Sequence, residues 1–159
     1  MIKDWPIRNI TDFEKDGELV AVKNILLSIY TLNPLKFNTG EHSIIDTGML
    51  AEYYCKKLFA LKDHKVWNGP FDAETEDGLR IEIKIRDCFK NNKITCPPGM
   101  KVNKENMDWL FYVSLNENFT LKAILAFYKD DIDQLQNGRV SFKKAFKEHK
   151  YQIIYDEAL

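Results

Sequence analysis

The sequence predicts an α/β protein in which a mixed central β-sheet is flanked by helices. Apolar residues recur at helical spacing in the first part of the chain, whereas later segments alternate between apolar and polar residues or are apolar throughout. Asp-Gly and Asn-Gly pairs separate several of these later segments, as turns between strands do. With 159 residues, 45% of them hydrophobic, the chain is long enough for one domain, 1–159, and too short for two.

Composition and charge limit the classes of function to consider. No apolar segment approaches the length of a bilayer span, and residues 1–10 lack the apolar core of a signal peptide, so we expect a cytoplasmic protein with no membrane partner. The net charge of −1 gives no global attraction to nucleic acid, so such a partner must meet a local basic patch. The cysteines have no C-x-x-C pairing and no histidines at zinc spacing, which predicts reduced structural thiols: Cys55, Cys88 and Cys96.

An N-terminal helix is the first element expected. Thr11 to Glu14 has the spacing of a capping box, and apolar residues follow at helical intervals from Phe13 to Tyr30. Asn33-Pro34 ends this segment, because the residue before a proline is disfavoured in a helix. We interpret it as an amphipathic helix that packs on the core.

A second helix is expected to begin at Asp46 or Thr47 and to run through Leu61. It is apolar around most of its circumference, as a helix buried on several sides would be. Glu52 and Lys56 fill its one narrow polar sector. Either they form an ordinary surface pair at i, i+4, or Glu52 points into a polar pocket that holds a cation.

A β-hairpin is expected between residues 71 and 88, after a first short strand at His64 to Trp67. Phe71 to Thr75 and Leu79 to Cys88 have strand-like composition, and Glu76-Asp77-Gly78 between them is a turn signal. A two-residue Asp-Gly turn would place Asp72 opposite Ile83, one step from Glu82.

The second strand of this hairpin alternates without a break. Ile81, Ile83 and Ile85 point to one face, and Glu82 and Lys84 share the other, because successive side chains of a strand project to opposite faces. Two carboxylates and an ammonium group, contributed by adjacent strands, suit metal-dependent attack on a phosphodiester. The alternative is a solvated polar face with salt bridges across the hairpin, in which Glu74 competes with Asp72.

The next segment, from Phe89 to Met107, is polar and locally basic. It could meet phosphate groups near the proposed site, or it could be an ordinary solvated loop. The candidate nucleic-acid-binding residues are Arg86, Lys90, Lys93 and Lys101.

The second half of the chain predicts three further strands and two short helices. Asp108 to Leu115 is largely apolar, as a central strand would be, and Leu121 to Tyr128 follows after a turn. A short helix is expected after Lys129 through Leu135, ended by Asn137-Gly138. A helix from Ser141 to His149 and a terminal strand from Tyr151 to Tyr155 follow.

Three motifs in this order resemble the PD-(D/E)xK nuclease superfamily. Pro70-Phe71-Asp72 is similar to its proline-flanked aspartate, Glu82-Ile83-Lys84 to its (D/E)xK strand, and Gly48 to Glu52 to its glutamate-bearing helix. This chain differs from the pattern in two respects: one residue separates Pro70 from Asp72, and no clear helix follows the motif strand.

The resemblance implies a restriction-endonuclease-like core with an extra N-terminal helix, and a nuclease, in particular an endonuclease, that hydrolyses DNA. Asp72, Glu82 and the Ile83 carbonyl would hold Mg²⁺, for which Mn²⁺ can substitute. Lys84 would orient or help to deprotonate the attacking water, and Glu52 would contact the metal directly or through water. A homodimer is compatible with this function. The alternative is a catalytically silent nuclease-fold module that binds nucleic acid or assembles with a partner.

Overall fold

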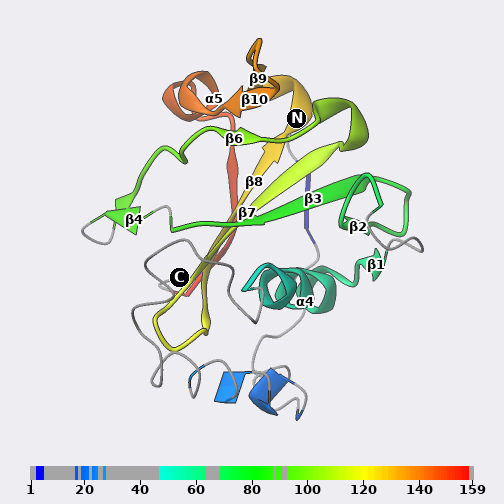
Figure 1. The fold of residues 1–159 in the computed structure, drawn as a ribbon, viewed down its shortest axis with the longest axis vertical. Coiled ribbons are helices and arrows are strands. Elements are labelled where there is room, and N and C mark those ends of the chain that lie inside the picture. The colour runs from blue at the N-terminus through cyan, green and yellow to red at the C-terminus, as the bar shows by residue number, and fades with distance from the viewer. Residues whose placement is uncertain are drawn as a thin grey trace.

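The computed structural model describes residues 3–5, 17, 19–21, 23–24, 27, 47–63, 69–87, 89–90 and 93–157. This part of the chain is a mixed α/β structure built on a six-stranded sheet with the order β1-β2-β3-β7-β8-β11 (Figure 1). The strands of this sheet are β1 (Lys62–Asp63), β2 (Ala73–Glu74), β3 (Arg80–Ile85), β7 (Trp109–Leu115), β8 (Leu121–Tyr128) and β11 (Gln152–Asp156).

Two smaller sheets, the helices α4 and α5 and two 3₁₀ turns also belong to the described structure. The three-stranded sheet has the order β6-β10-β9, and β4 pairs with β5 in a separate ribbon. The strands are β4 (Phe89–Lys90), β5 (Lys93–Ile94), β6 (Met100–Lys101), β9 (Asp133–Gln134) and β10 (Arg139–Ser141). The helices are α4 (Thr47–Phe59) and α5 (Lys143–Lys147), with 3₁₀ turns at η1 (Lys104–Asn106) and η2 (Lys129–Asp131).

The main sheet is mostly antiparallel, with one parallel pair at its centre. β3 and β7 run parallel, with Glu82 beside Leu110 and Lys84 beside Tyr112, whereas the other pairings in the described structure are antiparallel. A parallel pair needs a crossover connection. Here the crossover consists of β4, β5, β6 and η1, in keeping with the proline-containing, weakly periodic sequence of that segment.

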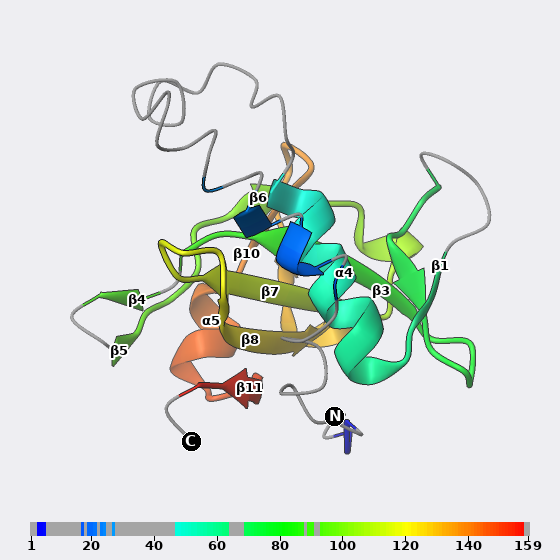
Figure 2. The same cartoon turned by 90° about the horizontal axis from the view of Figure 1, so that it is seen from below.

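Helix α4 lies against one side of the sheet (Figure 2), and each face of the sheet has its own apolar core. α4 covers one face, where Leu58 and Cys55 pack among Ile81, Ile83 and Phe111. The other face is covered by β6, β10 and α5, where Val140 and Phe142 pack with Leu110, Tyr112 and Phe127. β7 is therefore buried on both sides, which explains its continuous apolar sequence.

The elements packed on the two faces of the sheet determine which of them lies on the same side as the polar residues of β3. Ile81 and Ile83 are buried against α4, and Glu82 and Lys84 alternate with them. Because Glu82 and Lys84 are the neighbours of Leu110 and Tyr112, they project from the face that β6, β10 and α5 cover, at the side where β3 meets the short β2.

Several predicted elements are confirmed, and others are wrong in extent or type. The strands predicted at 108–115, 121–128 and 151–155 correspond to β7, β8 and β11, and the helix predicted at Ser141 to His149 is the shorter α5. The helix predicted from Lys129 to Leu135 is wrong, because the chain leaves η2 to bury Ile132 and then forms β9. Asn137-Gly138 is the turn between β9 and β10, not a helix end.

Two predictions fall largely outside the described residues. The strand at His64 to Trp67 is one of them; the adjacent described strand is β1. The N-terminal helix is the other, although residues 17, 19–21, 23–24 and 27 are helical. Within the described part of the chain, no helix is both long and apolar enough to cross a membrane.

Candidate active site

The turn between β2 and β3 determines how Asp72 approaches Glu82. The Gly78 amide donates to the Thr75 carbonyl at 3.1 Å, and the Thr75 amide donates to the Leu79 carbonyl at 3.0 Å, so residues 76–78 form the loop. Gly78 has a positive φ of 83°, which glycine adopts without steric cost. The predicted two-residue turn is therefore wrong by one residue, and Ala73 rather than Asp72 is the last paired residue, opposite Ile81.

Because the loop comprises residues 76–78, Asp72 lies at the edge of β3. The Asp72 amide donates to the Ile81 carbonyl at 3.0 Å, and its carboxylate Oδ2 accepts a hydrogen bond from the Ile83 amide at 2.6 Å. The side chain of Asp72 thus satisfies a backbone donor that strand pairing would otherwise satisfy. Its carboxylate is fixed beside β3, between the two faces of the sheet.

Lys84 connects the two carboxylates. Its Nζ lies 2.5 Å from Glu82 Oε1 and 3.6 Å from Asp72 Oδ2. The exposed fractions of the side chains are 15% for Glu82, 23% for Asp72 and 35% for Lys84, so the group is partly shielded but open to solvent. The structure thus brings together these three predicted site residues, which we call the β3 cluster: Asp72, Glu82 and Lys84.

Glu52 approaches the β3 cluster from α4 but has its own partner. Its Oε2 lies 2.9 Å from Lys56 Nζ, which also lies 2.7 Å from Asp63 Oδ1 on β1. The surface pair considered from the sequence is therefore present. Glu52 is still near enough for its negative charge to contribute to the raised pKa of Glu82.

Electrostatics show that the β3 cluster carries an excess of negative charge. Burial raises the pKa of Glu82, Lys84 counteracts this, and the charges of Asp72 and Glu52 raise it further. Burial alone would lower the pKa of Lys84, but Glu82 and Asp72 outweigh it and raise that pKa above its ordinary value. Beneath the cluster, burial together with Glu52 and Asp72 raises the pKa of the Cys55 thiol, which stays neutral.

The available donors fit a hard divalent cation with few protein ligands. Among the described residues, no three side chains of His, Cys, Asp or Glu form a ready-made metal site. Asp72 and Glu82 supply two carboxylates, and Mg²⁺ is commonly bound through one or two carboxylates while it keeps several waters. The Ile83 carbonyl stays the predicted backbone ligand. Glu74, the rival of Asp72, lies opposite Arg80 in β2 and makes no ion pair with Lys84 in the described structure.

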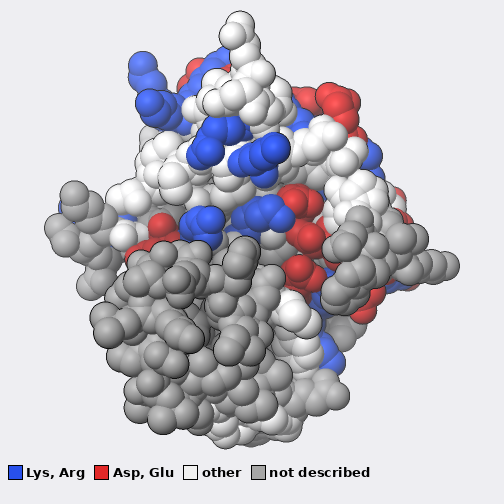
Figure 3. Space-filling model, viewed as in Figure 1, with Lys and Arg blue, Asp and Glu red and all other residues white. Residues whose placement is uncertain are grey.

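The four predicted basic residues do not form a single cluster. Arg86 follows β3 and is exposed, with its amide bonded to the Val113 carbonyl. Lys90 and Lys93 are partners in the β4–β5 ribbon, which projects from the body in both ribbon views, and Lys101 is exposed on β6. Figure 3 shows acidic side chains grouped over β3 and α4, with basic side chains directly beside them toward β6.

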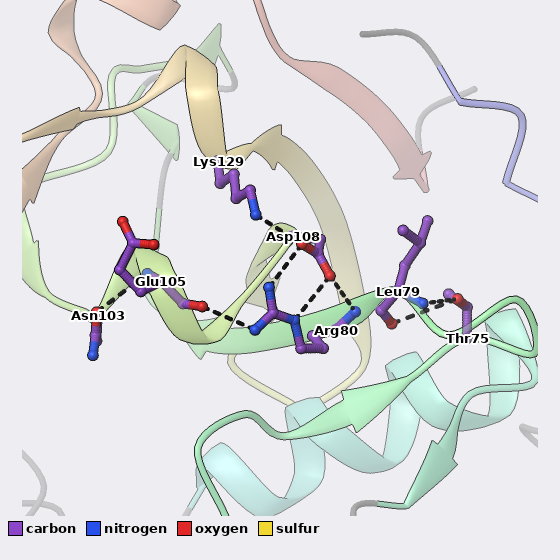
Figure 4. A network of polar contacts seen from close by, with 7 residues as sticks. All are labelled: Thr75, Leu79, Arg80, Asn103, Glu105, Asp108 and Lys129. Atoms are coloured by element: carbon purple, nitrogen blue, oxygen red, sulfur yellow. Dashed lines mark hydrogen bonds and ion pairs between the residues drawn. The ribbon is translucent and has the colours of Figure 1, made fainter.

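A second polar network, at the start of β3, was not predicted as a unit (Figure 4). Arg80 donates from Nε and Nη2 to the two carboxylate oxygens of Asp108, each at 3.0 Å, and the Arg80 amide donates to the same carboxylate at 3.0 Å. Lys129 Nζ donates to Asp108 at 2.9 Å, and Arg80 Nη1 donates to the Glu105 carbonyl at 2.9 Å. These hydrogen bonds hold the pKa of Asp108 well below its ordinary range.

This network aligns the starts of the two parallel strands. The Asp108 amide also donates to the Arg80 carbonyl at 2.8 Å, so backbone and side chains together join β3 to β7. In the sequence, the only signals were Arg80 on the polar face of its strand and Asp108 at the start of the next apolar run. The pairing itself joins residues 28 positions apart and follows from the parallel register.

Comparison with known proteins adds no family assignment, because neither a protein-family model nor a curated protein matches this chain.

Proposed function

We propose that this protein is a metal-dependent nuclease that hydrolyses phosphodiester bonds of DNA as an endonuclease. The observation that carries the proposal is the β3 cluster, in which Lys84 Nζ lies within 3.6 Å of carboxylate oxygens from both Asp72 and Glu82. These are the side-chain types expected for metal-assisted phosphoryl chemistry, and they lie beside basic side chains on the same surface (Figure 3).

Asp72 and Glu82, with the Ile83 carbonyl, are the residues that would hold Mg²⁺ or Mn²⁺. When bound, such an ion lowers the pKa of a coordinated water and neutralises charge that develops on the phosphate. The burial of Glu82, together with the nearby charges of Asp72 and Glu52, raises its pKa and supports this assignment, because a divalent cation would stabilise the ionised carboxylate.

Lys84 acts in this proposal as a positive charge rather than as a base. Its raised pKa favours the ammonium form, which can orient a water molecule and stabilise negative charge on the phosphate oxygens but cannot accept a proton. Glu52 acts through its charge from α4, held in place by Lys56.

A cleavage assay tests the proposal. Purified protein should cut DNA in Mg²⁺ or Mn²⁺ and not in EDTA, across a panel of duplex, branched and single-stranded substrates. Asp72→Asn and Lys84→Ala should each lower the rate by about 10²–10³-fold, the loss typical for removal of one group that stabilises the transition state. Glu74→Ala is the matched control in β2 and should leave cleavage unchanged. Circular dichroism checks that each variant is folded.

The runner-up is a catalytically silent module that binds nucleic acid or assembles with a partner. The observation that favours it is the internal pairing of the site: Lys84 pairs with the β3 carboxylates, and Lys56 pairs with Glu52. This candidate predicts DNA binding or self-association without cleavage and without a response to Mg²⁺. Cleavage that depends on Asp72 would exclude it.

A further inference from the structure

Two like charges lie directly opposite each other on the small sheet that covers one face of the main sheet. Lys101 of β6 and Arg139 of β10 are register partners in an antiparallel pair, and both side chains are exposed. Like charges in directly opposed positions destabilise a sheet. Stability therefore gives no reason for this arrangement, which we call the basic pair.

Among the residues that the structure describes, no acidic side chain compensates the basic pair. Within the described structure, neither Lys101 nor Arg139 belongs to an ion pair. The one acidic residue of this small sheet, Asp133, lies opposite Ser141. The two cations thus face solvent with their charges unneutralised.

The backbone fixes where the basic pair lies. The neighbouring positions, Met100 and Val140, pack into the core on the opposite side of the strands, so Lys101 and Arg139 point outward. The guanidinium of Arg139 donates to the Gly99 carbonyl. A Cβ on Gly99 would lie 2.7 Å from the Val140 carbonyl oxygen, so only glycine allows this close approach of the segment before β6 to β10.

The basic pair belongs to the layer that covers the face from which Glu82 and Lys84 project. Val140 and Met100 pack on Leu110 and Tyr112, which are the strand neighbours of Glu82 and Lys84. Figure 3 shows basic side chains over β6 on the same surface as the acidic group over β3. A polyanion that meets the β3 cluster would therefore be flanked by this layer.

We propose that Lys101 and Arg139 together bind the phosphodiester backbone of DNA and hold it against the β3 cluster. The identity of this ligand rests on the proposed nuclease function, whereas the site itself rests on the unneutralised opposed charges. Phosphate oxygens placed between two cations remove their repulsion, and the released counterions favour binding. Arg139 is the new member of this surface, because no local sequence pattern pairs residue 139 with residue 101.

Fluorescence anisotropy with a short labelled DNA duplex tests the proposal in EDTA, where binding is separate from cleavage. Lys101→Ala and Arg139→Ala should each raise Kd several-fold and reduce the slope of log K against log salt by about 0.9 per lost phosphate contact. Lys62→Ala is the matched control, an exposed lysine on β1 that lies away from β6 and β10 in Figures 1 and 2. It should leave both quantities unchanged.

A charge reversal separates binding from a structural role. Lys101→Glu places opposite charges in register, so the melting temperature should rise while DNA binding weakens. A residue with only a structural role would not produce these opposed effects. Variants that bind with the wild-type affinity and salt slope overturn the proposal, as does a wild-type protein that binds anionic lipid vesicles but not DNA. If wild-type protein binds DNA through these residues without cutting it, the inference holds and the nuclease function fails.

Discussion

The carboxylate of Asp72 accepts a hydrogen bond from the backbone amide of Ile83 at 2.6 Å. This contact lies where the ladder between β2 and β3 ends, so a side chain continues the pairing that the backbone no longer makes. It also fixes the Asp72 carboxylate 3.6 Å from Lys84 Nζ. Asp72 therefore has a structural role, as the acceptor for the Ile83 amide, and a proposed role as a metal ligand. Mutations can separate the two roles.

Asp72→Ala should destabilise the protein, whereas Asp72→Asn should not. Alanine leaves the partly buried Ile83 amide without its acceptor, which costs about 1–3 kcal/mol. Asparagine keeps an acceptor oxygen but loses the charge that a metal needs. Urea denaturation measures the difference in the free energy of unfolding. Equal losses in the two variants would contradict the hydrogen bond described here, and wild-type cleavage by Asp72→Asn would remove Asp72 from the proposed metal ligands.

Ionisation of Glu82 should lower the free energy of unfolding as the pH rises. Its pKa is higher in the folded state than the ordinary value of 4.5, so the folded state holds this proton more tightly than the unfolded state does. The contribution to stability is fully present below the ordinary pKa and is lost as the pH rises through the folded pKa. Glu82→Gln removes this titration.

The pH dependence can be isolated as a difference between two proteins. We expect the free energy of unfolding of wild type minus that of Glu82→Gln to decrease from about pH 4 toward neutrality, the range above the ordinary glutamate pKa. Urea denaturation at several pH values, without divalent metal, gives this difference. A difference that is constant with pH, or that increases, would show that folding does not raise the pKa of Glu82 by burial and nearby negative charge.

Divalent metal should stabilise the folded protein through the β3 cluster. A ligand at ten times its Kd contributes about 1.4 kcal/mol to the free energy of unfolding when it binds only the folded state. Thermal unfolding with and without Mg²⁺ measures this effect independently of any substrate. Wild type and Glu74→Ala should show the same increase in Tm, and Asp72→Asn and Glu82→Gln should show little. An equal increase in all four proteins would indicate non-specific binding elsewhere.

Asp108→Asn should destabilise the protein at neutral pH. The carboxylate accepts charged hydrogen bonds from Arg80 and Lys129, and we expect a loss of about 2 kcal/mol, within the range for hydrogen bonds to charged groups. Because the pKa of Asp108 is lowered by folding, this contribution is present above the ordinary aspartate pKa and is lost as the pH falls through the folded value.

The destabilisation by Asp108→Asn should therefore diminish in strong acid. Urea denaturation of the variant and the wild type at neutral pH and below about pH 3, under the ordinary aspartate pKa, makes the comparison. Asp133→Asn is the control, since Asp133 is exposed and makes no ion pair in the described structure, and it should change stability by less than about 0.5 kcal/mol. A loss that persists unchanged at low pH would mean that Asp108 acts through packing rather than charge.

Local sequence patterns predicted the longer strands of the main sheet, because strand periodicity is local, but not the short strands β4, β5, β6, β9 and β10. The alternation around Glu82 and the apolar runs of β7 and β8 each reflect which faces are buried, and the structure confirms these elements. Turn geometry was predicted less well. The loop before Leu79 has one residue more than predicted, which shifts the pairing of β2. Asn137-Gly138 is interpreted from the sequence as the end of a helix through Leu135, whereas it is the turn of the hairpin formed by β9 and β10.

The sequence by itself determined that Glu82 and Lys84 share one face of a strand, because side-chain direction in a strand depends only on position along the chain. Only the tertiary structure decided that Asp72, and not Glu74, reaches Lys84, since that depends on how the turn ends and how β2 leaves the ladder. It also decided that Arg139 lies opposite Lys101 and that Arg80 binds Asp108. These pairs are distant in the chain, and they meet because burial of two apolar faces, rather than any local preference, brings their strands together.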